Sequence, residues 1–240
     1  MSYVVVVGLF AVAFRGFGAD RPAGLFLTFA AGLLLGVVGP VIYMVWFRRR
    51  SLADLGIGGH RLRETALLGL ALTGIQFTMT LWGYDLPEPV DWVPLLVMSL
   101  VVDGFEAVLF RGFIQGRLES AFGTAPAVAG AALLYSLYHV GYGMGVSEMV
   151  FLFGLGVVYA VAYRLVGNVL VLWPLLTPLG AFFNNLESGD IELPWGSIAG
   201  FTNVAVVMGR AIVLAHRHER RRSRGRGVGK DESVSASLQR

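Results

Sequence analysis

Long apolar runs separated by short polar stretches cover most of this chain. The runs have roughly 16 to 25 residues, close to the length that crosses the hydrocarbon core of a membrane as an α-helix. Eight of them predict spans near residues 3–19, 23–47, 65–82, 93–117, 125–140, 148–163, 168–186 and 196–215. The first run crosses only if it continues to Ala19 and the Arg15 side chain extends to the interface. The pattern predicts an all-α polytopic membrane helix bundle of about eight transmembrane helices.

Composition supports this class. The chain is 55% hydrophobic and only 15% charged, whereas an ordinary soluble domain carries about 25% charged residues. Because it has no cysteine, disulfides, thiolate nucleophiles and cysteine-based metal sites are excluded. The net charge of +3 does not indicate a nucleic-acid partner, and the expected surroundings are the lipid bilayer.

The distribution of basic residues predicts the orientation. The basic segments are residues 48–63, Arg117, Arg164 and the stretch after residue 215, whereas the loops around Asp85, Gly143 and Asp190 have few or no basic residues. This alternation follows the positive-inside rule. We therefore expect an integral, multi-pass protein with a cytoplasmic C-terminus. Its transmembrane domain is residues 1–215, and the basic tail at 216–240 is predicted to be disordered.

Two carboxylates interrupt the run at 93–117. Glu106 lies near the middle of that run, where an acid is costly and usually functional. It is a candidate general base that activates water, and the alternative is an acid paired with a donor on a neighbouring helix. Asp103 lies three residues earlier on the same face of an α-helix. It is either a second carboxylate of the site or a residue facing a water-filled cavity.

Other polar residues in the apolar runs extend the candidate site. Arg111 follows Glu106 by five residues, about 140° round an α-helix, so the two side chains are not expected to face each other. We interpret Arg111 as an anchor within the site. The alternatives are a donor to a substrate carbonyl or water, and a side chain that extends to the headgroups. His139 is either a catalytic group or a satisfied core residue. Asn184 and Asn185 either end a helix or orient water and stabilise an oxyanion.

Together these motifs resemble the CAAX-processing and bacteriocin-processing (CPBP) intramembrane proteases. The chain has Glu-x-x-x-x-Arg-Gly-Phe on one predicted helix, an aromatic-x-x-x-His on the next, and a proline-interrupted run that ends in Asn-Asn. The family motifs are Glu-Glu-x-x-x-Arg, Phe-x-x-x-His and His-x-x-x-Asn. The resemblance covers about residues 51–186 and implies a similar bundle of about eight helices.

The resemblance also implies roles for particular residues. Glu106, Arg111, Tyr135, His139 and Asn185 match the family's glutamate, arginine, aromatic residue, histidine and final asparagine. In the family the glutamate and histidine activate a water that attacks a peptide bond, and the asparagine supports the oxyanion. The implied function is a metalloprotease-like intramembrane endopeptidase. It would act on a membrane-associated peptide or protein in what we expect to be a prokaryotic cell membrane.

Two positions depart from the family pattern. Ala107 replaces the second glutamate and Ala181 replaces the histidine of the third motif. A catalytic zinc site needs three protein ligands and a water, and the metal candidates in this chain are Glu106 and His139. Because these two family residues are replaced, the chain could instead be a catalytically degenerate relative that acts as a membrane binding, scaffold or immunity protein. A proton or solute carrier with a polar relay is a third class, but the chain shows no repeated half.

Overall fold

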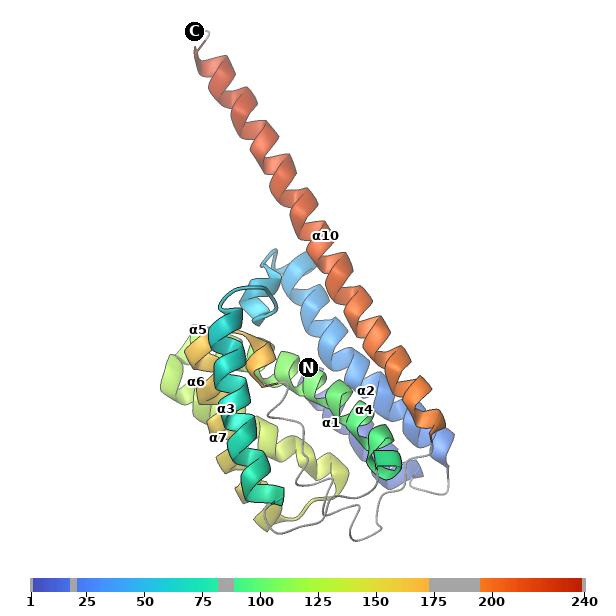
Figure 1. The fold of residues 1–240 in the computed structure, drawn as a ribbon. Helices are drawn as coiled ribbons and strands as arrows, with labels where there is room; N and C mark the ends of the chain where they lie inside the picture. The colour runs from blue at the N-terminus through green and yellow to red at the C-terminus, as the bar shows by residue number, and fades with distance from the viewer. Residues whose placement is uncertain (1, 18–20, 82–88, 173–194, 239–240) are drawn as a thin grey trace.

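The computed structural model describes residues 2–17, 21–81, 89–172 and 195–238, and all regular structure in these ranges is helical (Figure 1). The α-helices are α1 (Ser2–Ala11), α2 (Pro22–Ile42), α3 (Leu62–Leu81), α4 (Pro89–Glu106), α5 (Gly116–Phe122), α6 (Thr124–Tyr138), α7 (Val146–Val166) and α10 (Gly196–Leu238). Three π-helical segments are η1 (Val12–Phe17), η2 (Tyr43–Phe47) and η4 (Ala107–Gln115), and three 3₁₀ turns are η3 (Leu52–Leu55), η5 (His139–Tyr142) and η6 (Val169–Val171).

Three helices of the described chain are long and apolar enough to cross a membrane. They are Pro22–Phe47, Val146–Val166 and Gly196–Ser223, and Ser2–Phe17 forms a shorter apolar helix. These elements overlap the runs predicted at 23–47, 148–163 and 196–215, so the all-α prediction is confirmed for the described residues. The count of eight spans is not confirmed, and the run predicted at 168–186 lies mostly outside the described residues.

The predicted helix at 93–117 is part of a longer helical stretch. It begins with α4 at Pro89, continues through the π-helical η4 and ends with α5 at Phe122. The turn comes at Gly123, whose φ of 84° is accessible to glycine without strain. The stretch between the runs predicted at 93–117 and 125–140 is therefore helical except at Gly123, which makes the reversal into α6.

The N-terminal helix fixes the position of α6. The Tyr3 hydroxyl donates to the Leu134 carbonyl at 2.9 Å. At the other end of the pairing, the Arg15 guanidinium donates to the Val140 carbonyl at 2.7 Å. Arg15 therefore caps backbone in η5, directly after α6. Two contacts at opposite ends hold the segment that carries Tyr135 and His139.

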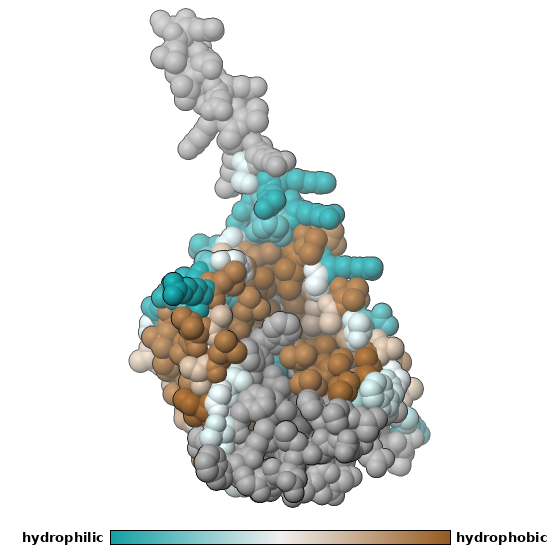
Figure 2. Space-filling model, in the orientation of Figure 1, coloured by the Kyte–Doolittle hydropathy of each residue, from teal (hydrophilic) through white to brown (hydrophobic). Residues whose placement is uncertain are grey.

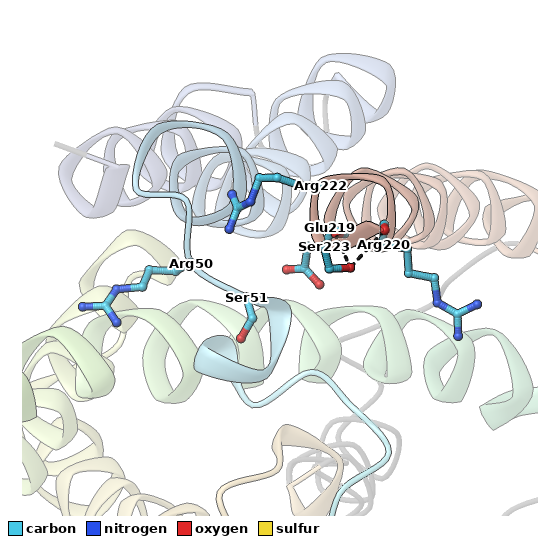
Figure 3. Close-up of a pocket in the computed structure, with 6 residues that line it drawn as sticks. All are labelled: Arg50, Ser51, Glu219, Arg220, Arg222 and Ser223. Atoms are coloured by element: carbon cyan, nitrogen blue, oxygen red, sulfur yellow. Dashed lines mark hydrogen bonds between the residues drawn. The ribbon is translucent and has the colours of Figure 1, made fainter. Parts of the chain in front are cut away.

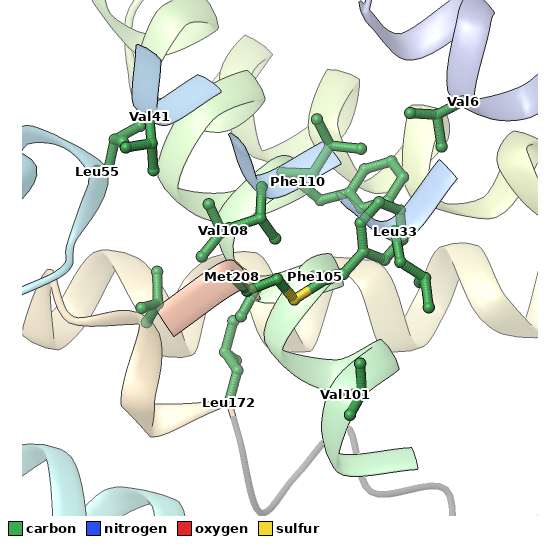
Figure 4. Close-up of a cluster of buried hydrophobic side chains, with 14 of the residues drawn as sticks. Val6, Leu33, Val41, Leu55, Val101, Phe105, Val108, Phe110, Leu172 and Met208 are labelled. Carbon is green, nitrogen blue, oxygen red and sulfur yellow. The ribbon is translucent and has the colours of Figure 1, made fainter. Parts of the chain in front are cut away.

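Aromatic and aliphatic side chains from α1, α2 and the α4–η4 stretch form the core (Figure 4). Phe105 packs on Phe10 with ring centroids 5.7 Å apart. A Cβ added to Gly36 of α2 would lie only 2.1 Å from the Phe105 ring. The absence of a side chain at Gly36 therefore lets α2 approach the helix that carries Glu106, as small residues do between membrane helices.

A loop between α2 and α3 packs against η4 from its other side. A Cβ added to Gly112 would lie 2.3 Å from the Leu55 carbonyl oxygen, so only glycine permits this approach. The Asn168 amide donates to the carbonyls of Gly58 and His60, each at 3.0 Å. These contacts join the loop to the end of α7 and hold the backbone beside the Arg-Gly pair in place.

Helix α10 leaves the body and continues beyond residue 215 (Figure 1). The first two turns of the tail predicted at 216–240 are helical and packed against the body. The Leu52 amide donates to the Glu219 carboxylate at 2.6 Å, and the Arg222 guanidinium donates to the Arg49 carbonyl at 2.6 Å. These contacts order the helix as far as Ser223.

Candidate functional site

Glu106 and Arg111 are buried at the junction of α4 and η4. Their exposed fractions are 6% and 1%, and the two side chains interact electrostatically. In a π-helix the backbone bonds join residue i to residue i+5, so residues five apart lie nearly one above the other. The predicted separation of about 140° assumed α-helical geometry, whereas residues 107–115 are π-helical. The π-helical turn brings Glu106 and Arg111 closer around the helix axis than an α-helix would.

Tyr135 of α6 contacts both charged groups. A side-chain hydrogen bond joins Tyr135 to the Glu106 carboxylate. The guanidinium carbon of Arg111 lies 5.1 Å from the centroid of the Tyr135 ring, within the range of a cation–π contact. The aromatic residue of the second motif therefore contacts both charged residues of the first motif. It orients Glu106 and Arg111 from a neighbouring helix.

A second carboxylate belongs to the same group of side chains. Asp103 is 1% exposed and interacts electrostatically with Tyr135 and Tyr159. Both tyrosines also interact with Glu106. Asp103 and Glu106 thus face the same pair of phenols, as their spacing of three residues on α4 predicted. Of the two alternatives for Asp103, this position favours membership of the site.

Two tyrosines were missing from the sequence-based site. Tyr159 of α7 and Tyr142 of η5 interact electrostatically with Glu106. Tyrosine is common at membrane interfaces, so neither residue carries a chemical signal by itself. The helical spacing of the buried residues Gly156, Tyr159 and Tyr163 marks one face of α7, and this periodicity is the signal that could have identified Tyr159.

His139 borders this group through aromatic rings. Its ring centroid lies 5.1 Å from that of Tyr135 and 5.5 Å from that of Tyr142. The His139 Nδ1 lies 2.9 Å from the Tyr135 carbonyl oxygen. A carbonyl only accepts, so Nδ1 carries the proton and Nε2 of the neutral ring keeps its lone pair. In the described chain no hydrogen bond or ion pair joins His139 directly to Glu106.

Arg111 keeps unused hydrogen-bond donors inside the protein. Both of its terminal nitrogens are buried, and neither has a hydrogen-bond partner among the described residues. One turn further on, the Gln115 amide donates to the Ala160 carbonyl at 2.9 Å. Buried polar groups are normally paired, so these guanidinium N–H groups are available to an acceptor that enters the site. Arg111 also interacts electrostatically with Glu106.

The described residues do not fit the zinc site that the family resemblance implies. Within the described ranges, no three histidine, cysteine, aspartate or glutamate side chains are grouped closely enough to hold a metal ion. Ala107 is a buried core residue and offers no ligand atom. Glu106 and His139 are the two metal candidates, and a catalytic zinc site needs a third protein ligand. We therefore assign no catalytic step to a metal.

The third motif lies outside the described residues. Asn184, Asn185 and Ala181 all fall in the range 173–194, so their predicted positions in the site remain predictions. The structure brings together Glu106 and Arg111 with the other members of this group, which are Asp103, Tyr135 and Tyr159. It places His139 at the edge of that group, one tyrosine ring away.

Residues 88–175 match the family model for type II CAAX prenyl endopeptidase Rce1-like proteins. This segment is an Rce1-like domain. The Rce1-like domain includes α4, η4, α5, α6 and α7 and so holds every described member of the candidate site. It confirms the resemblance and supports an intramembrane peptidase at the level of the family. No curated protein and no solved structure matches the chain.

Proposed function

We propose that this chain is an intramembrane, glutamate-dependent endopeptidase that cleaves a membrane-associated peptide or protein by attack of water. The observation that carries this proposal is the burial of Glu106 beside Arg111 and Tyr135 within the Rce1-like domain. A buried acid is costly in a membrane protein and is seldom kept without a task. General base catalysis requires a proton acceptor held in position. Arg111 and Tyr135 would hold the Glu106 carboxylate in this way.

The proposed reaction needs only groups of this chain and one water. Glu106 takes a proton from the water, and the water oxygen forms a bond to the carbonyl carbon of the scissile peptide. The carbonyl electron pair moves onto its oxygen and gives a tetrahedral oxyanion. When that pair returns, the carbon–nitrogen bond breaks and the proton on Glu106 passes to the leaving amine. The products are a carboxyl group and an amine.

The neighbouring side chains have distinct proposed roles. The unused N–H groups of Arg111 are donors for the oxyanion, and Arg111 also holds Glu106 by charge. Preorganised donors of this kind supply a large share of catalysis in other hydrolases. Asp103 offers a carboxylate one turn before Glu106, while the family's second glutamate position holds Ala107. His139 would share the water through Nε2, and Asn185 is proposed as a further oxyanion donor.

The proposed setting follows from the apolar helices and the basic loops. The chain would be a multi-pass protein of a prokaryotic cell membrane, with its C-terminus in the cytoplasm. The matched family is named for CAAX prenyl endopeptidases. We therefore propose that peptides with a prenylated CAAX end are the first substrates to try, followed by unmodified membrane-anchored peptides.

Purified protein in liposomes tests the proposal. The expected result is a defined peptide product, detected by mass spectrometry, from the wild type and from the Glu64→Gln control. Glu64 is an exposed acid at the start of α3, so its loss should not alter chemistry. The Glu106→Gln variant should give no product. Equal cleavage by both variants would show that Glu106 is not the base.

One observation favours a second candidate, a catalytically degenerate relative that acts as a membrane binding, scaffold or immunity protein. The buried Ala107 occupies the position of the family's second glutamate, and the described residues offer no three-ligand metal group. This candidate predicts that peptides bind without being cleaved, whether or not Glu106 is present. Cleavage that depends on Glu106 would exclude it.

A further inference from the structure

Side chains near the described end of α10 are hydrogen-bonded to the loop that follows η2. Glu219 accepts a hydrogen bond from the Leu52 amide at 2.6 Å. Arg222 donates to the Arg49 carbonyl at 2.6 Å and to the Val45 carbonyl at 3.4 Å. In Figure 3 both side chains extend from α10 toward this loop, beside a pocket that the two segments line together. Glu219 and Arg222 therefore join α10 to the loop.

The bond to Glu219 completes the capping of η3. Asp54 accepts a hydrogen bond from the Ser51 amide at 2.7 Å, and the Ser51 hydroxyl accepts one from the Asp54 amide at 3.3 Å. This capping box satisfies two amides and leaves the amide of Leu52, the first residue of η3, to a partner outside the loop. A carboxylate on α10 is that partner, and hydrogen bonds to a charged acceptor are stronger than neutral ones.

The contacts with α10 also hold the loop in a strained conformation. Arg49 has a φ of 53°, in the left-handed region that is unfavourable for a residue with a Cβ atom. Its carbonyl accepts the shorter of the two hydrogen bonds from Arg222. Trp46, three residues earlier, stacks on His218 of α10 with ring centroids 5.0 Å apart. Strained backbone persists where the surrounding structure holds it, so the position of the loop depends on α10.

The opposite end of η3 lies against η4, in the candidate site. Leu55 is fully buried, and its carbonyl oxygen would lie 2.3 Å from a Cβ added to Gly112. Gly112 directly follows Arg111, whose guanidinium contacts the Tyr135 ring and interacts with Glu106. Because η3 packs between α10 and η4, a shift of η3 would displace the backbone that carries Arg111.

The linkage lies at the polar end of the molecule. Figure 2 shows hydrophilic side chains above the hydrophobic part of the described surface, where α10 leaves the body. Glu219 and Arg222 are half-buried in this region, whereas Glu106 and Arg111 are buried in the bundle. Any effect of Glu219 on the candidate site must therefore pass through η3 and η4.

We propose that Glu219 is a positioning residue for the Glu106 site. It holds the first residue of η3 and thereby keeps the Leu55 carbonyl seated on Gly112, which fixes the backbone at Arg111. Glu219 does not touch the reacting atoms. Its effect on the rate of cleavage rests on the proposed peptidase function, whereas its effect on the position of η4 does not.

Cleavage by the full chain in liposomes, followed over a range of peptide concentrations, gives the first test. Glu219→Ala should lower kcat about fivefold, within the roughly tenfold that a charge-assisted hydrogen bond contributes. KM should change little, because Arg111 is proposed to bind the oxyanion and not the ground state. Glu219→Gln keeps an oxygen that can accept from Leu52 and should retain most of the rate. Both variants remove the charge, so their difference isolates the hydrogen bond.

The matched control for the cleavage test is Glu148→Ala. Glu148 accepts a hydrogen bond from the Gly145 amide at 2.5 Å, so its loss removes the same kind of bond at the start of α7. This variant should cleave at the wild-type rate. Equal losses in Glu219→Ala and Glu219→Gln, or wild-type cleavage by Glu219→Ala, would overturn the proposal.

Amide hydrogen exchange of the same proteins in detergent micelles gives the second test. In Glu219→Ala, residues 52–55 and 107–115 should both exchange severalfold faster than in the wild type, and Glu148→Ala should leave both segments unchanged. Faster exchange confined to residues 52–55, or no change in either segment, would overturn the proposal. If the wild type cleaves no peptide, the proposed function fails, and exchange at residues 107–115 still decides whether Glu219 positions η4.

Discussion

Tyr135 is the residue that joins the parts of the candidate site. Its side chain bonds to the Glu106 carboxylate, its ring lies under the Arg111 guanidinium, and its carbonyl accepts from His139. Sequence reasoning identified Glu106 as the central acid and His139 as a neighbour. It had no means to show that the aromatic residue of the second motif connects them, because side-chain contacts between helices leave no pattern along the chain.

The Tyr135→Phe substitution removes the hydroxyl and keeps the ring, so it tests the contribution of the hydroxyl alone. The ring remains to pack on Arg111, so we expect little change in thermal stability. The lost hydrogen bond leaves Glu106 less well oriented, and peptide cleavage should fall about tenfold, in line with a hydrogen bond to a charged group of roughly 1.5 kcal/mol. The measurement is the cleavage rate at saturating peptide. Tyr43→Phe, at a tyrosine whose ring packs on Phe113 of η4, is the control, and an equal loss there would contradict the role of Tyr135.

The electrostatic interaction between Glu106 and Arg111 predicts that substitutions at the two residues change the free energy of unfolding non-additively. Arg111→Met leaves a buried carboxylate without its counter-charge and should destabilise the fold by about 3 kcal/mol or more. Adding Glu106→Gln to that variant removes the uncompensated charge. The double variant should therefore recover about 1–3 kcal/mol relative to the sum of the single effects. Unfolding in mixed detergent measures all three, and strictly additive effects would show that the two side chains do not interact.

At the scale of elements, the π-helical segment η4 decides which residues meet. The sequence correctly indicated a helix here and correctly placed its acid near the middle. It could not reveal the change from α to π geometry, since an apolar run fits either kind of helix. The same limit explains the missed continuation to Phe122, because helix ends depend on caps and contacts more than on hydropathy.

Gly112→Ala tests this packing. Its Cβ would lie 2.3 Å from the Leu55 carbonyl oxygen, so the loop must move, and we expect a loss of about 1–3 kcal/mol, as for other overpacked sites. Gly104→Ala is a matched control on the same helical stretch, because nothing lies within 4 Å of its added Cβ. That variant should be neutral or more stable. Equal thermal midpoints for both variants would contradict the close approach at Gly112.

At the scale of the whole molecule, the apolar pattern predicted a membrane helix bundle, and the described helices agree. The number of spans could not be fixed in this way. Short apolar helices such as Ser2–Phe17 have hydropathy suited to either crossing or packing inside a bundle, and their length alone does not decide between them. Sequence reasoning named Glu106, Asp103 and Tyr135 for the candidate site, whereas Tyr142 and Tyr159 emerged only from the packing of the helices around η4.

Single cysteines test the orientation cleanly, since the chain contains none of its own. Ser120, near the end of α5, is on the predicted cytoplasmic side, and Ser147, at the start of α7, is on the predicted external side. In intact cells a membrane-impermeant maleimide should label Ser147→Cys and leave Ser120→Cys unlabelled until the cells are lysed. The reverse result would invert the orientation, and labelling of both would contradict a membrane-spanning path between them.

The central claim is that the buried Glu106 carboxylate activates the water that cleaves the peptide. Its most direct test is a single-turnover measurement with Glu106→Gln in liposomes, in which binding and cleavage of one peptide are followed in the same sample. We predict wild-type binding with cleavage reduced about 100-fold or more, the contribution expected of a general base. Binding and cleavage both at the wild-type level would contradict the claim.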